Sequence, residues 1–119
     1  MDSEVRANKP TRETVRGWMR PNRGLLPAQD TCNVDRWSPR TRAAAYLIQY
    51  LTDNTGMGPR YAAQVARHAA GLEPLGESQR ESEGQMMALG PGAVLFIHRE
   101  VLAACHVPGW ETDGGSTGV

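Results

Sequence analysis

The sequence predicts a mainly α-helical fold, a small single domain of about four short helices around a helical hairpin at residues 39–70. The chain has 119 residues, 39% of them hydrophobic, which is enough for one compact core and little else. Two successive segments carry apolar residues at helical spacing, and each segment begins with a proline. A short β-prone run near residues 93–98 is the one place where the sequence suggests a strand.

The helical hairpin is the strongest of these expectations. Ser38 is a suitable N-cap, and Pro39 suits the first helical position because its ring nitrogen has no hydrogen to donate. The following residues place an apolar stripe on one face, formed by Ala44, Leu47, Ile48 and Leu51. The sequence "TGMG" ends this helix, Pro59 opens the next, and Gly71 is a suitable C-cap. The second helix has a stripe of small residues that lets its partner approach closely, formed by Ala62, Val65, Ala66 and Ala69.

The segment before the hairpin is expected to be a basic arm and loop. Residues 1–10 read as a flexible lead-in, and the single domain is expected to span residues 11–110. Thr11 is a plausible N-cap for a short helix, "RETVRGWM", whose apolar stripe is Val15, Trp18 and Met19. Pro21 ends this helix, and residues 22–37 show no clear period, so residues 11–37 as a whole form the arm and loop.

The segment after the hairpin is less decided. Ser78 and Glu81 fit a capping box, which predicts a helix from Gln79 towards Leu89 that Gly84 weakens. Gly90-Pro91-Gly92 is a firm break, and a last helical turn or two is expected around Val101, Leu102 and Cys105. The sequence leaves open whether residues 85–98 form a hairpin or a helix. Residues 111–119, "ETDGGSTGV", are expected to be a disordered tail.

Cysteine content and hydropathy indicate a cytoplasmic protein without a membrane segment. Cys32 and Cys105 are the only cysteines, whereas a secreted domain of this size usually carries several disulfides. The N-terminal ten residues contain no hydrophobic stretch of the kind that a secretory signal needs. The longest apolar run, residues 93–97, is far shorter than a membrane span.

Charge is unevenly distributed along a chain whose formal net charge is zero. Residues 1–42 carry nine Lys or Arg against five Asp or Glu, and residues 43–119 carry four against eight. All but one of the thirteen basic residues are arginine, whose planar fork suits bidentate contacts to phosphate or carboxylate. The asymmetry has two readings: a basic region for an acidic partner, or two halves of one fold that neutralise each other.

The arginines of the N-terminal third are the candidate binding residues. Arg12, Arg16 and Arg20 recur every four residues, which places them in one stripe on the first helix. Such a stripe grips a phosphate backbone or an acidic protein surface. The alternative is a solvated face paired with Glu73, Glu77, Glu81 and Glu83. The predicted binding set is Arg12, Arg16, Trp18, Arg20, Arg23, Arg36, Arg40 and Arg42.

The histidines and cysteines towards the C-terminus favour a core edge over a reactive site. His98, Glu100, Cys105 and His106 are metal ligands in type, but their spacing matches none of the familiar zinc motifs. Cys105 falls on the apolar stripe of Val101 and Leu102, where a free cysteine is usually a small buried hydrophobe. We therefore expect no catalytic residue, no metal ligand and no cofactor.

The element order resembles that of a winged helix, but DNA reading through its third helix is not expected. The would-be recognition helix, "SQRESEG", carries Glu81 and Glu83 against the single Arg80, and acidic side chains repel phosphates. If DNA is bound, the N-terminal region binds it.

These observations predict a small non-enzymatic binding or accessory protein. Its partner is an acidic protein surface or nucleic acid, and no membrane is involved. High arginine content, small size and the lack of a catalytic signature are typical of an accessory protein of a phage or other mobile element. The alternatives are a self-assembling structural component, in keeping with a homo-oligomer, and a small enzyme that uses Cys105 and His98.

Overall fold

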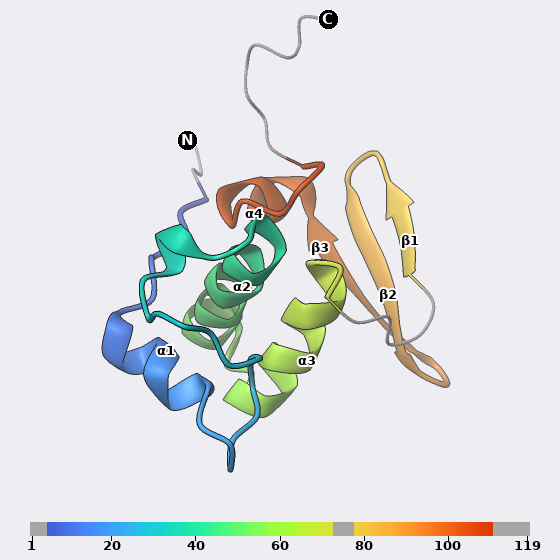
Figure 1. The fold of residues 1–119 in the computed structure, drawn as a ribbon. Coiled ribbons are helices and arrows are strands. Elements are labelled where there is room, and N and C mark those ends of the chain that lie inside the picture. Colours follow the sequence, from blue (N-terminus) through green and yellow to red (C-terminus); the bar gives the residue numbers. More distant parts are fainter. Residues whose placement is uncertain (1–4, 73–77, 111–119) are drawn as a thin grey trace, which may run out of the picture.

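The computed structural model describes residues 5–72 and 78–110. Helices form one layer, and a three-stranded antiparallel sheet stands beside them on the side opposite the first helix (Figure 1). The order of elements along the chain is α1 (Arg12–Trp18), η1 (Val34–Arg36), α2 (Pro39–Thr55), α3 (Pro59–Ala69), β1 (Ser78–Glu81), β2 (Gly84–Gly90), β3 (Ala93–His98) and α4 (Arg99–Ala104). The expected mainly helical fold around a helical hairpin is confirmed, and so is a β element at residues 93–98.

The α2–α3 hairpin forms the centre of the molecule. The Ser38 hydroxyl accepts a hydrogen bond from the Thr41 amide at 3.4 Å, and Pro39 occupies the first turn of α2. Gly56 ends α2 with a φ of +78°, a left-handed conformation that glycine adopts at little cost. The predicted stripes are buried: Ala44, Leu47, Ile48 and Leu51 on α2, and Ala62, Val65, Ala66 and Ala69 on α3. Small side chains on both helices allow their backbones to pack closely.

The N-terminal segment packs onto this hairpin. Thr11 caps α1 by accepting from the Thr14 amide at 3.2 Å, as the sequence predicts. Val15 and Trp18 point into the core, and further along the segment Leu25, Leu26, Val34 and Trp37 are also buried. The region expected to be a basic arm and loop therefore supplies a substantial part of the core. Of the expected lead-in, residues 5–10 are described, and Pro10 is buried.

The predicted helix from Gln79 towards Leu89 is wrong, because this segment forms a β-hairpin. β1 and β2 pair antiparallel across the two residues Ser82 and Glu83, with Glu81 opposite Gly84. β2 pairs in turn with β3, with Met86 opposite Phe96 and an irregularity between Ala88 and Gly90. The β-prone run of β3 supplies a hairpin partner for residues 84–90, and this strand pairing outweighs the local capping signal.

The sheet buries one face against the helices. Met87 and Ile97 lie on the covered face, where they join Leu102, Cys105 and Val107 in the core. The last helical turns around Val101, Leu102 and Cys105 are confirmed as α4 and its C-cap. His106 follows with a φ of +65°, and the Val107 amide donates back to the Leu102 carbonyl at 2.9 Å, which closes the helix end.

The predicted tail at residues 111–119 lies outside the described residues. In the part of the chain that the structure describes, no helix combines the length and apolar character that crossing a bilayer requires.

Candidate functional site

Helix α1 holds two of the candidate arginines on its outer side. Val15 and Trp18 bury the inner side of the helix, so Arg12 and Arg16 are directed outward and are exposed. The helix ends at Trp18, so Arg20 lies beyond it rather than on a third helical turn. Arg20 is exposed nonetheless, because the chain turns tightly there and the Arg23 and Gly24 amides both donate to the Arg20 carbonyl at 2.9 Å.

The loop that carries Arg20 and Arg23 is fixed to the core. The Leu25 and Leu26 amides donate to the Trp18 carbonyl at 3.1 and 3.3 Å. From α3, the guanidinium of Arg67 donates to the Leu25 carbonyl at 2.6 Å. Sequence reasoning missed this role of Arg67, because its partner is a backbone carbonyl 42 residues earlier in the chain.

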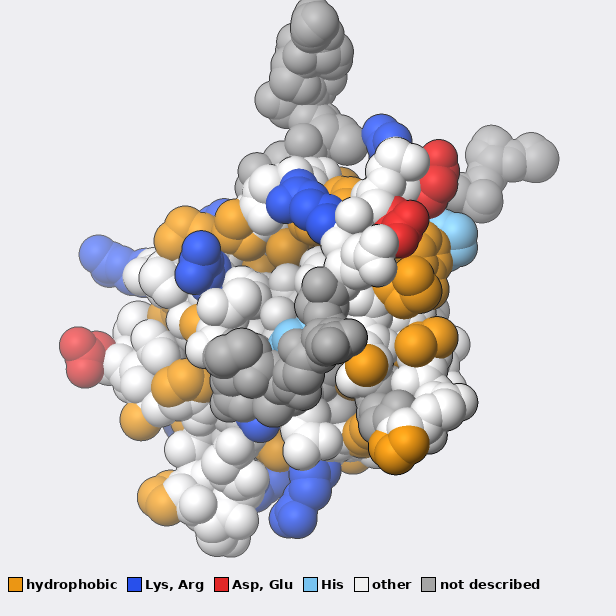
Figure 2. Space-filling model, turned by 90° about the vertical axis from the view of Figure 1, so that its right-hand side faces the viewer, with side chains coloured by type: hydrophobic (Ala, Val, Ile, Leu, Met, Phe, Trp, Pro, Cys, Tyr) orange, Lys and Arg blue, Asp and Glu red, His pale blue; other side chains and the backbone are white. Residues whose placement is uncertain are grey.

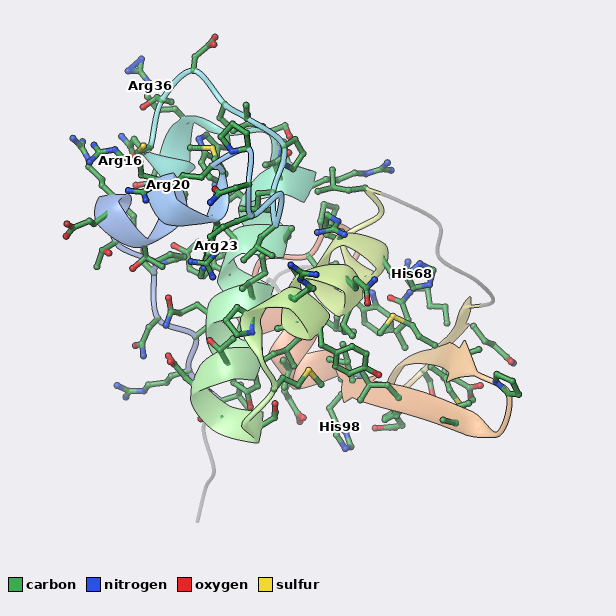
Figure 3. The ribbon with its side chains drawn as sticks, turned by 90° about the horizontal axis from the view of Figure 1, so that it is seen from below. Arg16, Arg20, Arg23, Arg36, His68 and His98 are labelled. Atoms are coloured by element: carbon green, nitrogen blue, oxygen red, sulfur yellow. The ribbon has the colours of Figure 1, made fainter. Side chains whose placement is uncertain are left out.

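The short helix η1 brings a fifth arginine to the same end of the molecule. Asn33 caps η1 by accepting from the Asp35 amide at 3.2 Å, and the Trp37 indole donates to the Thr31 carbonyl at 2.8 Å. Arg36 is exposed on this turn. Figure 3 shows that Arg36 lies at the same end as Arg16, Arg20 and Arg23, whereas His98 lies at the opposite end.

We call the exposed set Arg12, Arg16, Arg20, Arg23 and Arg36 the arginine surface. Within the described residues, none of these five guanidinium groups has a side-chain hydrogen bond or an ion pair. The nearest acidic side chain of η1, Asp35, is engaged by Lys9 at 2.6 Å. That hydrogen bond, with further attraction from Lys9 and Arg42, lowers the pKa of Asp35, so the carboxylate is ionised at neutral pH.

Three of the predicted binding residues lie away from the arginine surface. Trp18 is 6% exposed, and its ring belongs to the core. Arg40 extends towards the end of α3, where it donates to the Gly71 carbonyl at 3.4 Å. The Nε of Arg42 is buried and has no hydrogen-bond partner, so this side chain is directed inward over part of its length.

The acidic residues proposed as internal partners do not meet the arginines where they are described. Glu81 and Glu83 belong to the β1–β2 hairpin, on the side of the molecule opposite α1 (Figure 1). Glu73 and Glu77 lie outside the described residues.

A shallow cleft of about 390 Å³ adjoins the arginine surface. Its walls come from the chain before α1 and from the chain before and within η1, and they include Cys32 and the Lys9–Asp35 ion pair. Because Lys9 and Asp35 compensate each other, the cleft offers an anion mainly the guanidinium of Arg12, which lies at its rim.

The histidines and the cysteine of the C-terminal half do not form one cluster among the described residues. Cys105 is fully buried, and burial raises the pKa of its thiol to about 12. His98 is exposed on β3, and the ring of His106 packs edge-on against Tyr46 at 4.9 Å. His68 lines a different cleft of about 200 Å³ together with Arg40 and Arg80. Among the described residues, no three His, Cys, Asp or Glu side chains form a group that could hold a metal ion.

Comparison with protein-family models, with curated proteins and with solved structures gives no match, so the arginine surface is interpreted from its own residues.

Proposed function

We propose that this protein is a non-enzymatic binding protein whose arginine surface holds the phosphate backbone of double-stranded nucleic acid. The observation that carries the proposal is the set of five exposed arginines at one end of the molecule, none of which has a side-chain hydrogen bond or ion pair within the described residues. Arginines that stabilised the fold would be expected to contact carboxylates or backbone carbonyls, as Arg40, Arg67 and Arg80 do.

Arginine is well suited to a phosphate backbone. Its guanidinium is charged at every physiological pH and donates two parallel hydrogen bonds to phosphate oxygens. The five side chains come from α1, the loop after it and η1, so they extend over a surface rather than converge on one small ligand. An extended array of charges matches a repeating polyanion better than a single anion.

The burial of the tryptophans favours a duplex over a single strand. Proteins that bind single strands generally stack the bases on exposed aromatic rings. Trp18 and Trp37, the aromatic residues of this segment, are 6% and 7% exposed and are fixed in the core. The arginine surface therefore offers charge without a stacking platform, which suits phosphates whose bases remain paired.

The lack of an apolar anchor favours nucleic acid over an acidic protein. Protein interfaces have an apolar or aromatic centre that supplies most of the binding free energy. Among the described residues, the exposed large hydrophobic side chains are Tyr61, Val94 and Phe96, on α3 and β3. None of these belongs to the arginine surface.

The test is the affinity of a fluorescent duplex for the wild-type protein and for a triple variant, Arg12→Glu, Arg16→Glu and Arg20→Glu. We expect charge reversal to weaken duplex binding by about a hundredfold or more, because three phosphate contacts become repulsive. Arg16→Glu alone is compared with the control Arg60→Glu, which changes the net charge by the same amount at an exposed helical arginine outside the arginine surface. The control should leave the affinity within about twofold of wild type.

Circular dichroism of the triple variant separates binding from folding. A folded variant that binds as tightly as wild type would overturn the proposal. An unfolded variant would assign the arginines to the stability of the fold. A pull-down from the native host with and without nuclease gives a second test: a partner that survives nuclease treatment would favour an acidic protein.

A further inference from the structure

The sheet has a second face that no described element covers. Residues that pair across antiparallel strands share a face, so Met86 and Phe96 lie together, as do Ala88 and Val94. These four residues alternate with Met87 and Ile97, which point into the core. We call Met86, Ala88, Val94 and Phe96 the outer sheet face.

The outer sheet face is apolar; Ala88, Val94 and Phe96 are exposed, and Met86 is half-buried. Val94 is 64% exposed and Phe96 is 38% exposed, which makes them two of the three exposed large hydrophobic residues of the described chain. Figure 2, which looks onto this side of the molecule, shows hydrophobic side chains gathered beside acidic side chains and a histidine. Clustered apolar exposure with a charged border is typical of an interaction surface.

The aromatic ring at the centre of this face is held in place before any partner arrives. The Phe96 ring lies over Gly84, where a Cβ would approach its Cζ to 2.8 Å. The His98 ring stands perpendicular to it, with the two centroids 5.1 Å apart. A ring fixed in this way loses little side-chain entropy on docking, which is a property of interface anchors.

We propose that the outer sheet face binds a second copy of this chain as a two-fold symmetric dimer, with the axis along β2. The proposal is independent of the arginine surface, because it depends on other residues and other observations. In a two-fold symmetric dimer both copies use the same surface patch, so the outer sheet face must be complementary to itself.

The polar side chains that border the face favour a second copy as its partner. Glu81, Gly84 and His98 form one row across the three strands, because Glu81 pairs with Gly84 and Gly84 pairs with His98. Two strand spacings separate Glu81 from His98 by about 10 Å, too far for contact within one chain. A two-fold axis along β2 exchanges β1 with β3 and therefore places Glu81 of each copy opposite His98 of the other. Two carboxylate–imidazole pairs then flank the apolar centre.

The next row fits the same axis. Gln79 pairs with Met86, and Met86 pairs with Phe96. The axis places Met86 against Met86 of the second copy, and an unbranched thioether adapts well to such a self-contact. The four apolar residues of the face are far fewer than the roughly 20–30 residues per side of a standard interface, so we expect a weak and reversible dimer.

The dimer leaves both arginine surfaces accessible. The sheet and α1 lie on opposite sides of the molecule (Figure 1), so docking through the sheet places the two arginine surfaces at the outer ends.

Sedimentation velocity over a concentration range from micromolar to several hundred micromolar tests the proposal. Val94→Lys should raise the dimer dissociation constant by about tenfold or more, because it places a charge in the apolar face of each copy. The matched control is Gln64→Lys, which adds the same charge at an exposed position of α3 and should leave the constant unchanged.

A charge exchange tests the row geometry directly. Glu81→Lys alone should weaken the dimer because it removes the carboxylate that faces the imidazole, and His98→Glu alone should weaken it because it places two carboxylates opposite one another. The double variant places an ammonium group opposite a carboxylate and should recover most of the wild-type association. This recovery requires that the two residues meet between copies, and a merely structural role of either residue does not produce it.

Three results would overturn the proposal. The first is a monomer at every concentration, and the second is a dimer that Val94→Lys leaves intact in a folded protein. The third is association that the triple arginine variant abolishes while the sheet variants do not, which would indicate head-to-tail contact between opposite charges.

Discussion

At the scale of single residues, Cys105 illustrates how position determines reactivity. Its thiol is buried in the hydrophobic core at the end of α4. Burial raises its pKa to about 12, which leaves almost no thiolate at pH 8. We predict that Cys32, which is half-buried, reacts with Ellman's reagent in the native protein, whereas Cys105 reacts only after unfolding.

The measurement is a thiol titration at pH 8 in buffer and in guanidinium. One thiol per chain should react in buffer and both in denaturant. The variant Cys32→Ser should abolish the native reaction. Rapid modification of both thiols in the folded protein would show that Cys105 is accessible.

Leu47 is the corresponding test of the core. It is completely buried in α2, and the small alanines around the hairpin give it few neighbours that could move to fill a void. Leu47→Ala should therefore lower the free energy of unfolding by about 2–5 kcal/mol. Circular dichroism melts measure this loss, and Gln64→Ala on the exposed side of α3 serves as the control. An unchanged melting midpoint would contradict the packing.

Single-residue exposure could be predicted from the sequence only in part. Helical periodicity identified Leu47, Ile48 and Leu51 as core residues, and the structure buries them. The same reasoning cannot separate Arg16, which is exposed and has no side-chain hydrogen bond or ion pair within the described residues, from Arg40, which donates to a backbone carbonyl, or from Arg42, which is half-buried. The difference depends on which tertiary contacts each guanidinium group makes, and the order of residues along the chain does not show these contacts.

At the scale of elements, the sheet depends on Gly84. A Cβ at this position would clash with the Ile97 carbonyl and approach the Phe96 ring to 2.8 Å, and the carbonyl cannot move without breaking the β2–β3 pairing. We predict that Gly84→Ala lowers the free energy of unfolding by about 1–3 kcal/mol. Denaturant unfolding provides the measurement.

Gly17→Ala is the matched control. A Cβ at Gly17 would meet only the end of the Arg23 side chain, at 4.0 Å, so alanine should stabilise α1 by about 0.5–1 kcal/mol. Equal effects of the two substitutions would contradict the close approach at Gly84.

The same glycine shows why local signals gave the wrong structure for residues 79–89. Read locally, Ser78 and Glu81 are a capping signal and Gly84 is a weakness in a helix. In the structure, Gly84 is instead where β2 begins and where the Phe96 ring finds room. A residue that weakens a helix is thus required by the sheet, and the pairing of Gly84 with His98, 14 residues later in the chain, decides between the two structures.

At the scale of the whole molecule, the arginine surface lies away from the acidic side chains of the β1–β2 hairpin. Arg12 belongs to α1, and Figure 3 shows Arg16, Arg20, Arg23 and Arg36 at one end of the molecule, whereas Glu81 and Glu83 lie at the sheet. We predict that duplex binding weakens with salt, with a slope of log K against log salt of about −4 to −5 if all five arginines contact phosphates.

Titrations between about 50 and 300 mM salt measure this slope. Arg36→Gln should reduce its magnitude by about one unit if that contact is made. A slope near zero would contradict backbone binding. The sequence shows the charge imbalance between residues 1–42 and 43–119. It does not show where the basic and acidic side chains lie on the folded molecule, because that depends on how the elements pack.

The hydrogen bond from Arg67 to the Leu25 carbonyl has a kinetic consequence. It holds the loop of Arg20 and Arg23 against α3, so the free protein already has the geometry of the proposed binding surface. A partner then meets a finished surface, and association should proceed in one step at a rate governed by diffusion and electrostatic attraction. Removing this hydrogen bond with Arg67→Met should add a slow conformational phase to stopped-flow traces of binding. A single unchanged phase would show that the loop is ordered without the contact from α3.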